Sequence, residues 1–436
     1  MTGRGRSAEI FESLKQTGME EAEVYLKSGR SRRFEVGLQG KAGSSSVEHG
    51  WAIRAGSSRS SMFVAGTGFP KASLNWPEPD GQPLRLPAAA PIPPWRPPID
   101  LDTGLVAESE AVALLTGIES TLVHEVPGSR LILGQLEEGT SETSILSTHG
   151  VDVGYRSRAA SLFVEAVGPW QGSASAVLSL AERDHRAFQP ARIAKRLANQ
   201  LLLTRQGGAP SRERGDVLVS AAVAARILAS LMPLFVGAEA ETLARRFRDR
   251  RGRLGSSLLT IIDDGRLAAG VLESPADGEG LPTGPVVLVE EGMYRQPLVD
   301  RKQSRVGSPS VFGCARRESW RDLPQTSPSH LYLQPRGGVA VGELLGSVAR
   351  GYYLLEPLGS GMFDFERDHF RLPVCGFVLR QGQATAPLSR TWLEGGIGAL
   401  LRNIQAVARD LSFQPLGAMI GAPTLLISGL GLRSME

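Results

Sequence analysis

The sequence is poor in cysteine, lysine and histidine, and each shortage restricts its chemistry. Only two cysteines, Cys314 and Cys375, occur in 436 residues. A disulfide scaffold needs more, so a reducing compartment, the cytoplasm, is expected. The basic start of the chain lacks the apolar core of a signal peptide. Arginines outnumber lysines by 42 to six, a skew typical of genome composition. The net charge of +3 is too balanced for a dedicated nucleic-acid binder.

The six histidines never recur at the helical spacing that zinc sites use. His124-Glu125 begins like a zinc motif, but Pro127 and Gly128 follow and no second histidine does. Asp184-His185 and Asp368-His369 are expected in surface turns. The sequence therefore predicts no metal site in this chain.

One segment has the length of a membrane span. Val217 to Val236 is nearly all apolar, but Arg226 stands at its centre and Pro233 interrupts its end. A charge at the centre of a spanning helix costs about 2.5–3.5 kcal/mol. We therefore expect a buried helix in a soluble core, and no membrane.

Length and pattern predict an α+β protein of two domains. A mixed α/β domain (1–206) is followed by a β-rich domain with antiparallel sheet (207–436), and the boundary is a segment rich in Gly, Pro and charge. Ten prolines between 70 and 98 predict a long extended loop over the surface. Helices are expected at Glu9–Lys15, Glu108–Glu119, Pro190–Leu203, Val341–Arg350 and Gly396–Asp410. Strands are expected at 50–55, 61–65, 131–133, 142–148, 154–166, 258–262, 285–290, 330–333, 351–355, 375–380 and 423–427, with a hairpin turn through Glu138-Gly139-Thr140.

Several short motifs follow one another in the second half of the chain. They are Leu259-Thr260-Ile261-Ile262-Asp263-Asp264-Gly265, Gly278-Glu279-Gly280-Leu281-Pro282, Gly313-Cys314-Ala315-Arg316-Arg317-Glu318-Ser319-Trp320, Leu333-Gln334-Pro335 and Gly421-Ala422-Pro423-Thr424-Leu425-Leu426-Ile427. Together they resemble the TldD/PmbA (TldE) family. The resemblance covers most of the chain, and it is stronger after residue 215 than before residue 165.

One arm of that family is a zinc peptidase with His-Glu-x-x-x-His about 30 residues before the DDG. Here that position reads Ile227-Leu228-Ala229-Ser230-Leu231-Met232, and the late cysteine ligand falls near Ala408-Arg409. Ile227, Leu228 and Met232 supply neither a metal ligand nor a base. The resemblance thus implies the TldE/PmbA arm, with no catalytic residue and no cofactor in this chain, and with zinc in a partner.

The implied function is that of a non-catalytic subunit beside a zinc-bearing TldD-like sister, which cuts unfolded peptides and small proteins. Strand addition to an exposed edge in the β-rich half would hold such a peptide. In the family, Arg316, Arg317 and Glu318 lie near the cleft between subunits; a structural salt-bridge turn is the alternative. Two other functions stay open: a peptide-binding or regulatory homodimer, in a family once linked to DNA gyrase, and a divergent hydrolase using Cys314.

Overall fold

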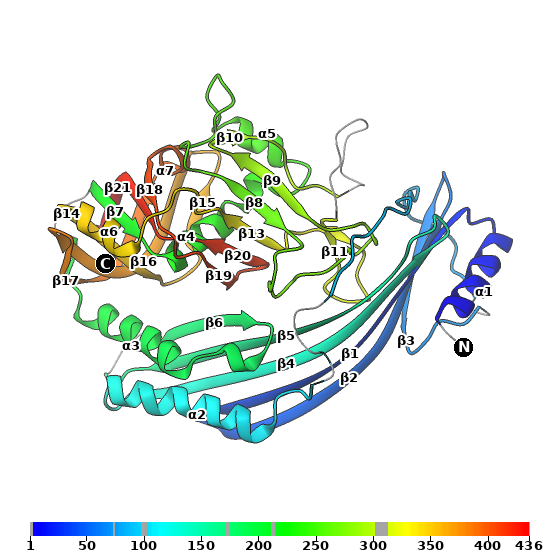
Figure 1. The fold of residues 1–436 in the computed structure, drawn as a ribbon, viewed down its shortest axis with the longest axis horizontal. Helices are drawn as coiled ribbons and strands as arrows, with labels where there is room; N and C mark the ends of the chain where they lie inside the picture. The colour runs from blue at the N-terminus through cyan, green and yellow to red at the C-terminus, as the bar shows by residue number, and fades with distance from the viewer. Residues whose placement is uncertain are drawn as a thin grey trace.

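A computed structural model describes residues 3–72, 75–96, 101, 103–170, 175–210, 214–300 and 313–435. The N-terminal half builds one antiparallel sheet in the order β3-β2-β1-β4-β5-β6, which curves beneath the C-terminal half (Figure 1). Its strands are β1 (Glu21–Gly37), β2 (Gly40–Gly56), β3 (Ser61–Thr67), β4 (Arg130–Ser147), β5 (Asp152–Val167) and β6 (Ala176–Glu182). Its helices are α1 (Gly3–Gln16), α2 (Glu108–Glu125), the short 3-10 turn η1 (His185–Ala187) and α3 (Pro190–Gln206).

The two faces of this sheet follow from the alternation of side chains along each strand. On β1, Val24 packs into the cluster of α1, whereas Phe34 and Val36 pack into the cluster of α2. These residues share the outer face. Tyr25 points the other way and joins Trp320 of the C-terminal half. The inner, concave face therefore looks toward the C-terminal half.

The C-terminal half has two larger sheets. One is mixed, in the order β10-β9-β8-β13-β20-β19; in the other, β14, β7, β21, β17 and β16 close into a ring, because β14 also pairs with β16. The strands are β7 (Arg214–Val219), β8 (Ile261–Asp264), β9 (Pro285–Glu290), β10 (Met293–Tyr294), β11 (Ala315–Arg316), β12 (Gln325–Thr326), β13 (His330–Leu333), β14 (Arg350–Pro357), β15 (Met362–Asp364), β16 (His369–Arg380), β17 (Gln383–Gly395), β18 (Ile404–Val407), β19 (Ser412–Pro415), β20 (Met419–Ala422) and β21 (Leu425–Ser434). The helices are α4 (Ala221–Ser230), the 3-10 turn η2 (Met232–Leu234), α5 (Ala240–Arg245), α6 (Val341–Ser347) and α7 (Ile397–Arg402).

The α+β class with antiparallel sheets is confirmed, and three local predictions are wrong. Val217–Val236 is not one helix: Val217–Val219 pairs inside a sheet, and the Ser220 hydroxyl accepts from the Val223 N–H to start α4. Residues 138–140 form no turn, because β4 runs unbroken between β1 and β5 there. The helix predicted at 396–410 ends at Arg402, and Ile404–Val407 then pairs with β21.

The Pro-rich stretch contains no helix or strand in its described part, in agreement with the prediction; residues 73, 74, 97 and 98 lie outside the described residues. Far from lying only on the surface, it buries Leu86, whose N–H donates to Glu21. At its end, Trp95 Nε1 donates to Glu273 Oε1 at 3.2 Å. The stretch therefore runs from the N-terminal sheet to the C-terminal half. Among the described helices, none combines the length and apolar character needed to cross a membrane.

Candidate functional site

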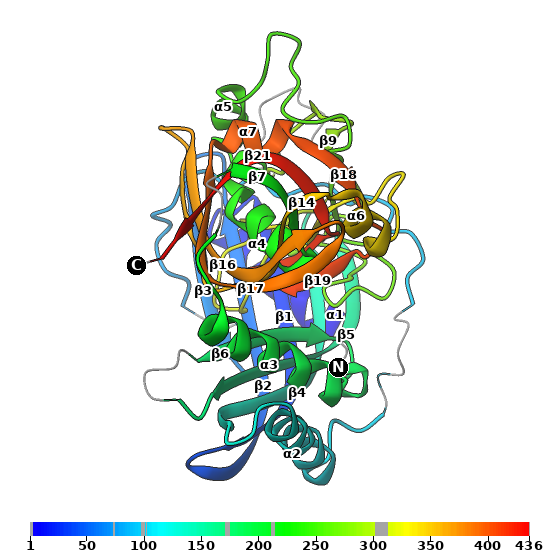
Figure 2. The same ribbon diagram turned by 90° about the vertical axis from the view of Figure 1, so that its left-hand side faces the viewer.

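Helix α4 carries the positions where the family resemblance places the zinc motif, and hydrocarbon fills them. Ile227 and Leu228 are 5% and 4% exposed in the main C-terminal core, and Met232 packs against it from η2. Aliphatic side chains line a cavity of about 30 Å³ beside them. Figure 2 shows α4 surrounded by the strands of this half. At the late cysteine position, Ala408 is fully buried.

These residues do not fit a zinc ion. Zinc needs imidazole, thiolate or carboxylate ligands, whereas Ile227 and Leu228 of α4 offer alkyl groups and Met232 of η2 offers a thioether. A polar ligand placed there would also lose its hydration in an apolar cavity.

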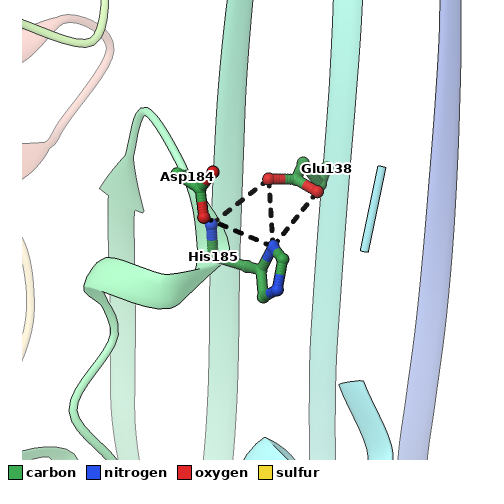
Figure 3. Close-up of side chains that lie close together, drawn as sticks. All are labelled: Glu138, Asp184 and His185. Atoms are coloured by element: carbon green, nitrogen blue, oxygen red, sulfur yellow. Dashed lines mark hydrogen bonds and ion pairs between the residues drawn. The ribbon is translucent and has the colours of Figure 1, made fainter. Parts of the chain in front are cut away.

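A different group of metal-type ligands lies in the N-terminal half. Glu138, Asp184 and His185 bring donor atoms within 4.8 Å of one another, the one such group among the described residues (Figure 3). However, the buried Arg158 already supplies a cation: its Nη2 lies 3.0 Å from Glu138 Oε1 and 3.6 Å from Asp184 Oδ2. Glu138 also accepts the Val106 N–H at 2.6 Å. The group is an internal ion-pair network that fixes η1 and the segment before α2.

This network corrects the prediction for Asp184-His185. His185 is 4% exposed, with its Nδ1 3.2 Å from Glu138 Oε1, and does not lie in a surface turn. The burial of His185 was not predicted because the sequence pattern placed its partner Glu138 in a turn, whereas in the structure Glu138 lies in the middle of β4.

The two halves of the chain meet at a second buried network. Arg54 of β2 donates to Glu23 of β1 at 2.6 Å and to Glu279 at 3.0 Å. Arg317 donates to Glu23 as well, and its Nε reaches the Gly278 carbonyl at 3.0 Å. Burial alone would raise the pKa of Glu23, but the two guanidinium groups outweigh it and hold that pKa below its ordinary value. Charge thus holds the concave sheet to the C-terminal half.

Two buried aspartates lie behind this network. Asp277 accepts backbone N–H groups from Glu279, Leu281 and Ala315, yet burial, assisted by the Glu279 carboxylate, raises its pKa to about 7. Burial likewise raises the pKa of Asp263 to about 6, although Arg316 opposes the shift. These carboxyls titrate near neutrality inside the junction.

The same surroundings argue against a Cys314 nucleophile. Burial, followed by the charge of Asp277 and Asp263, raises the pKa of the thiol far above its usual range. Its Sγ donates to the Val299 carbonyl at 3.1 Å, and the residue is 3% exposed. A protonated thiol without access to a substrate has no means of attacking it.

The three residues predicted to lie near the cleft are found in three different environments. Arg316 donates to the Ser329 hydroxyl, and Arg317 is buried in the junction over the Tyr25 ring. Glu318 is exposed, and its carbonyl accepts from Lys27 Nζ at 3.5 Å. For Arg317 the geometry favours the salt-bridge alternative, whereas the Glu318 carbonyl contacts Lys27, which lines an open groove.

This groove, about 420 Å³ in volume, lies on the concave face just beyond the junction. Its lining residues are Lys27, Gly29, Arg30, Ser31, Ser46, Glu48, Glu137, Gly139, Thr140, Ser141, Ser157, Ala159, Ala160, Ser161 and Ala181. The floor consists of small side chains in register across the sheet: Gly29 faces Ser141, which faces Ser157. The groove was not predicted from the sequence, although small residues at alternate positions were the available signal.

Comparison with known proteins now defines the class. The family model of the PmbA/TldA metallopeptidase C-terminal domain matches residues 212–434, just over half of the chain. The chain therefore belongs to the TldD/PmbA family, which confirms the resemblance read from the motifs.

Individual relatives agree. A metalloprotease TldD homolog of Buchnera aphidicola (subsp. Schizaphis graminum) is 28% identical over 170 residues, which are 39% of this chain and 35% of the relative. A zinc metalloprotease TldD homolog of Saccharolobus solfataricus is 24% identical over 231 residues, 50% and 48% of the two chains. The chain thus matches about a third to a half of the length of these relatives.

Solved structures extend the likeness in fold to the whole chain. TldE from Thermococcus kodakarensis superimposes with a TM-score of 0.82 at 18% identity, covering 98% of this chain and 100% of TldE. A candidate DNA gyrase modulator from Thermotoga maritima gives 0.81 at 16% identity, covering 99% and 100%. At these identities the likeness establishes the fold alone.

Proposed function

We propose that this chain is the non-catalytic subunit of a TldD/TldE-type zinc metallopeptidase complex that processes unstructured peptides and small proteins. One observation carries the proposal: Ile227, Leu228 and Met232 replace a ligand set and a base with core hydrocarbon. The reacting zinc and its general base belong to a sister chain.

The concave groove is this chain's contribution to the substrate. A floor of Gly, Ser and Ala leaves room for an extended backbone of almost any sequence, as a processing enzyme for unstructured chains requires. Lys27 and Glu48 at its border supply one charge of each sign for polar contacts with the peptide. The sister's zinc site would act on the segment that the groove presents.

Affinity purification of the chain from its native lysate, with mass spectrometry of the co-purifying proteins, tests the proposal. We expect a stoichiometric partner that carries His-Glu-x-x-x-His, and peptide hydrolysis only by the pair. Stoichiometric zinc and hydrolysis in the isolated chain would refute it. A preparation free of any such sister would favour the peptide-binding or regulatory homodimer instead.

A further inference from the structure

A buried arginine directly after β6 has a hydrogen-bond donor that no described residue accepts from. Arg183 is 5% exposed. Its Nε donates to the Gly270 carbonyl at 2.7 Å, and its Nη2 donates to Glu273 Oε2 at 3.0 Å. Its Nη1 is buried and unpartnered. Because leaving a buried charged donor unsatisfied is unfavourable, Nη1 favours a ligand that brings an acceptor.

A second arginine presents the same feature. Arg316 is half-buried, and its Nη2 donates to the Ser329 hydroxyl. Its Nε is buried and meets no acceptor in the described part of the chain. The hydroxyl of Ser274, a residue adjacent to Glu273, is buried in the same unpartnered state. Three donors from three separate segments therefore lack acceptors in this region.

The two arginines surround one imidazole ring. His330 is 1% exposed, with Nδ1 2.9 Å from the Asp264 carbonyl and Nε2 accepting the Leu272 N–H at 3.2 Å. Burial lowers the pKa of His330 to about 4, and the charges of Arg316 and Arg183 both add to this shift. The two guanidinium groups thus lie around the same ring, and this neutral ring with both nitrogens occupied accepts from neither.

This arginine pair lies at one end of the concave groove. The register of β5 and β6, extended by one residue, places Ala159 opposite Arg183, and Ala159 and Ala181 both line the groove. The Arg316 charge acts on Tyr155, which follows the groove residue Ser157 on the same face of β5. The groove therefore extends from β2 across the sheet and ends at the arginines, against the C-terminal half.

We propose that this end of the groove binds the C-terminal carboxylate of a peptide between Arg183 and Arg316. The proposal rests on the proposed function, in which the groove holds the substrate. Guanidinium N–H groups match the two oxygens of a carboxylate in geometry and charge. Access is past Arg316, Tyr155 and Trp95, which are all partly exposed.

A terminal carboxylate fits better than an acidic side chain within a longer peptide. Behind Arg183 the way is closed by Gly270 and Glu273, which both bond to its guanidinium group. A chain that lies along the groove cannot continue past this point. The small side chains of the floor leave the rest of the peptide unselected. The substrate class is therefore peptides of varied sequence with a free C-terminus.

Matched peptides and the purified full chain test the site. The probe is the hexapeptide Gly-Ser-Ala-Gly-Ser-Ala with an N-terminal fluorophore, prepared as the free acid and as the C-terminal amide. We expect fluorescence anisotropy to show at least tenfold tighter binding of the free acid. Equal affinities would overturn the carboxylate site and leave the groove as a peptide site. If neither peptide binds, both the site and the role of the groove are wrong.

A third peptide identifies the source of the carboxylate. It is the amide form with aspartate in place of the first alanine, so that its one carboxylate is internal. We expect it to bind as weakly as the unsubstituted amide. Binding as tight as that of the free acid would overturn the assignment to the C-terminus.

Variants assign the preference to the arginines. Arg316→Gln should bind the free acid as weakly as the amide, with the affinity for the amide unchanged. Its circular dichroism spectrum should be unaltered, because Arg316 bonds only to a hydroxyl among the described side chains. Arg183→Gln should have the same effect on binding. Arg295→Gln, at an exposed arginine paired with Glu290 at 2.8 Å, is the control and should keep the tenfold preference. A preference that persists in Arg316→Gln overturns the proposal.

Discussion

The core around α4 and the junction around Glu23 are both fully buried, but opposite chemistry stabilises them. Around α4, aliphatic side chains pack on one another. At the junction, Glu23, Arg54, Glu279 and Arg317 are buried together and each depends on the others. An apolar core loses stability in proportion to the volume removed, whereas a charge network fails when one partner is lost.

The difference between the α4 core and the junction also bears on the function of the chain. Ile227 and Leu228, where we propose that the zinc motif is replaced, pack as ordinary core. The charged network instead connects β1 and β2 of the concave sheet to Glu279 and Arg317 of the C-terminal half.

The largest effect is expected at the junction. Arg54→Ala leaves Glu23 with one cationic partner and Glu279 with none, and breaking a buried ion pair costs about 3–5 kcal/mol. Urea denaturation measures the loss. Arg33→Ala is the matched control, because Arg33 pairs with Glu137 on the same sheet at 2.7 Å but is 47% exposed. Its pair should contribute less than about 1 kcal/mol. Equal losses in the two variants would remove the contrast between core and junction.

A smaller loss is expected in the apolar core. Leu228→Ala enlarges a cavity that is already present, and such changes cost about 2–5 kcal/mol. Leu323→Ala, at a leucine that is 46% exposed, is the control and should change stability by less than about 0.5 kcal/mol. Peptide binding by Leu228→Ala should be unaltered, since α4 lies away from the groove. A specific loss of zinc from that variant would contradict our interpretation of α4.

The apolar core around α4 could be predicted from the sequence, whereas the charged junction could not. The apolar run and the missing histidines are local signals, and from them the sequence alone predicts that Ile227 and Leu228 replace the zinc motif. The junction is not local: Arg54 meets Glu279 across 225 positions and Arg317 meets Glu23 across 294. The alternation of polar and apolar residues also failed to predict β4 at Glu138, because this residue carries a buried charge within the strand. Fold class and most helices follow from local pattern, whereas buried polar pairs follow from topology.

The smallest effect is a pH dependence that only the junction should show. Asp277 has a pKa of about 7 in the folded protein, because burial favours its neutral form, and an ordinary value of 3.8 when unfolded. The folded protein therefore keeps a proton that unfolding releases, and rising pH destabilises it. His330 has the opposite sign, because burial lowers its pKa to about 4, and its unfolded form, half protonated at pH 6.5, offsets part of this loss. Between pH 6.5 and 8 we expect a net loss of about 0.5 kcal/mol.

The variant Asp277→Asn separates this titration from every other one. It cannot take up or release the proton, so its urea midpoint should stay level from pH 6.5 to 8 while that of the unaltered chain declines. Its absolute stability will be lower, because the Ala315 N–H loses its acceptor, and only the slope is diagnostic. Leu228→Ala, whose change lies in the apolar core, should keep the full slope. A decline in Asp277→Asn as steep as in the unaltered chain would show that another group titrates, and the charge of Asp277 would then no longer set the two regions apart.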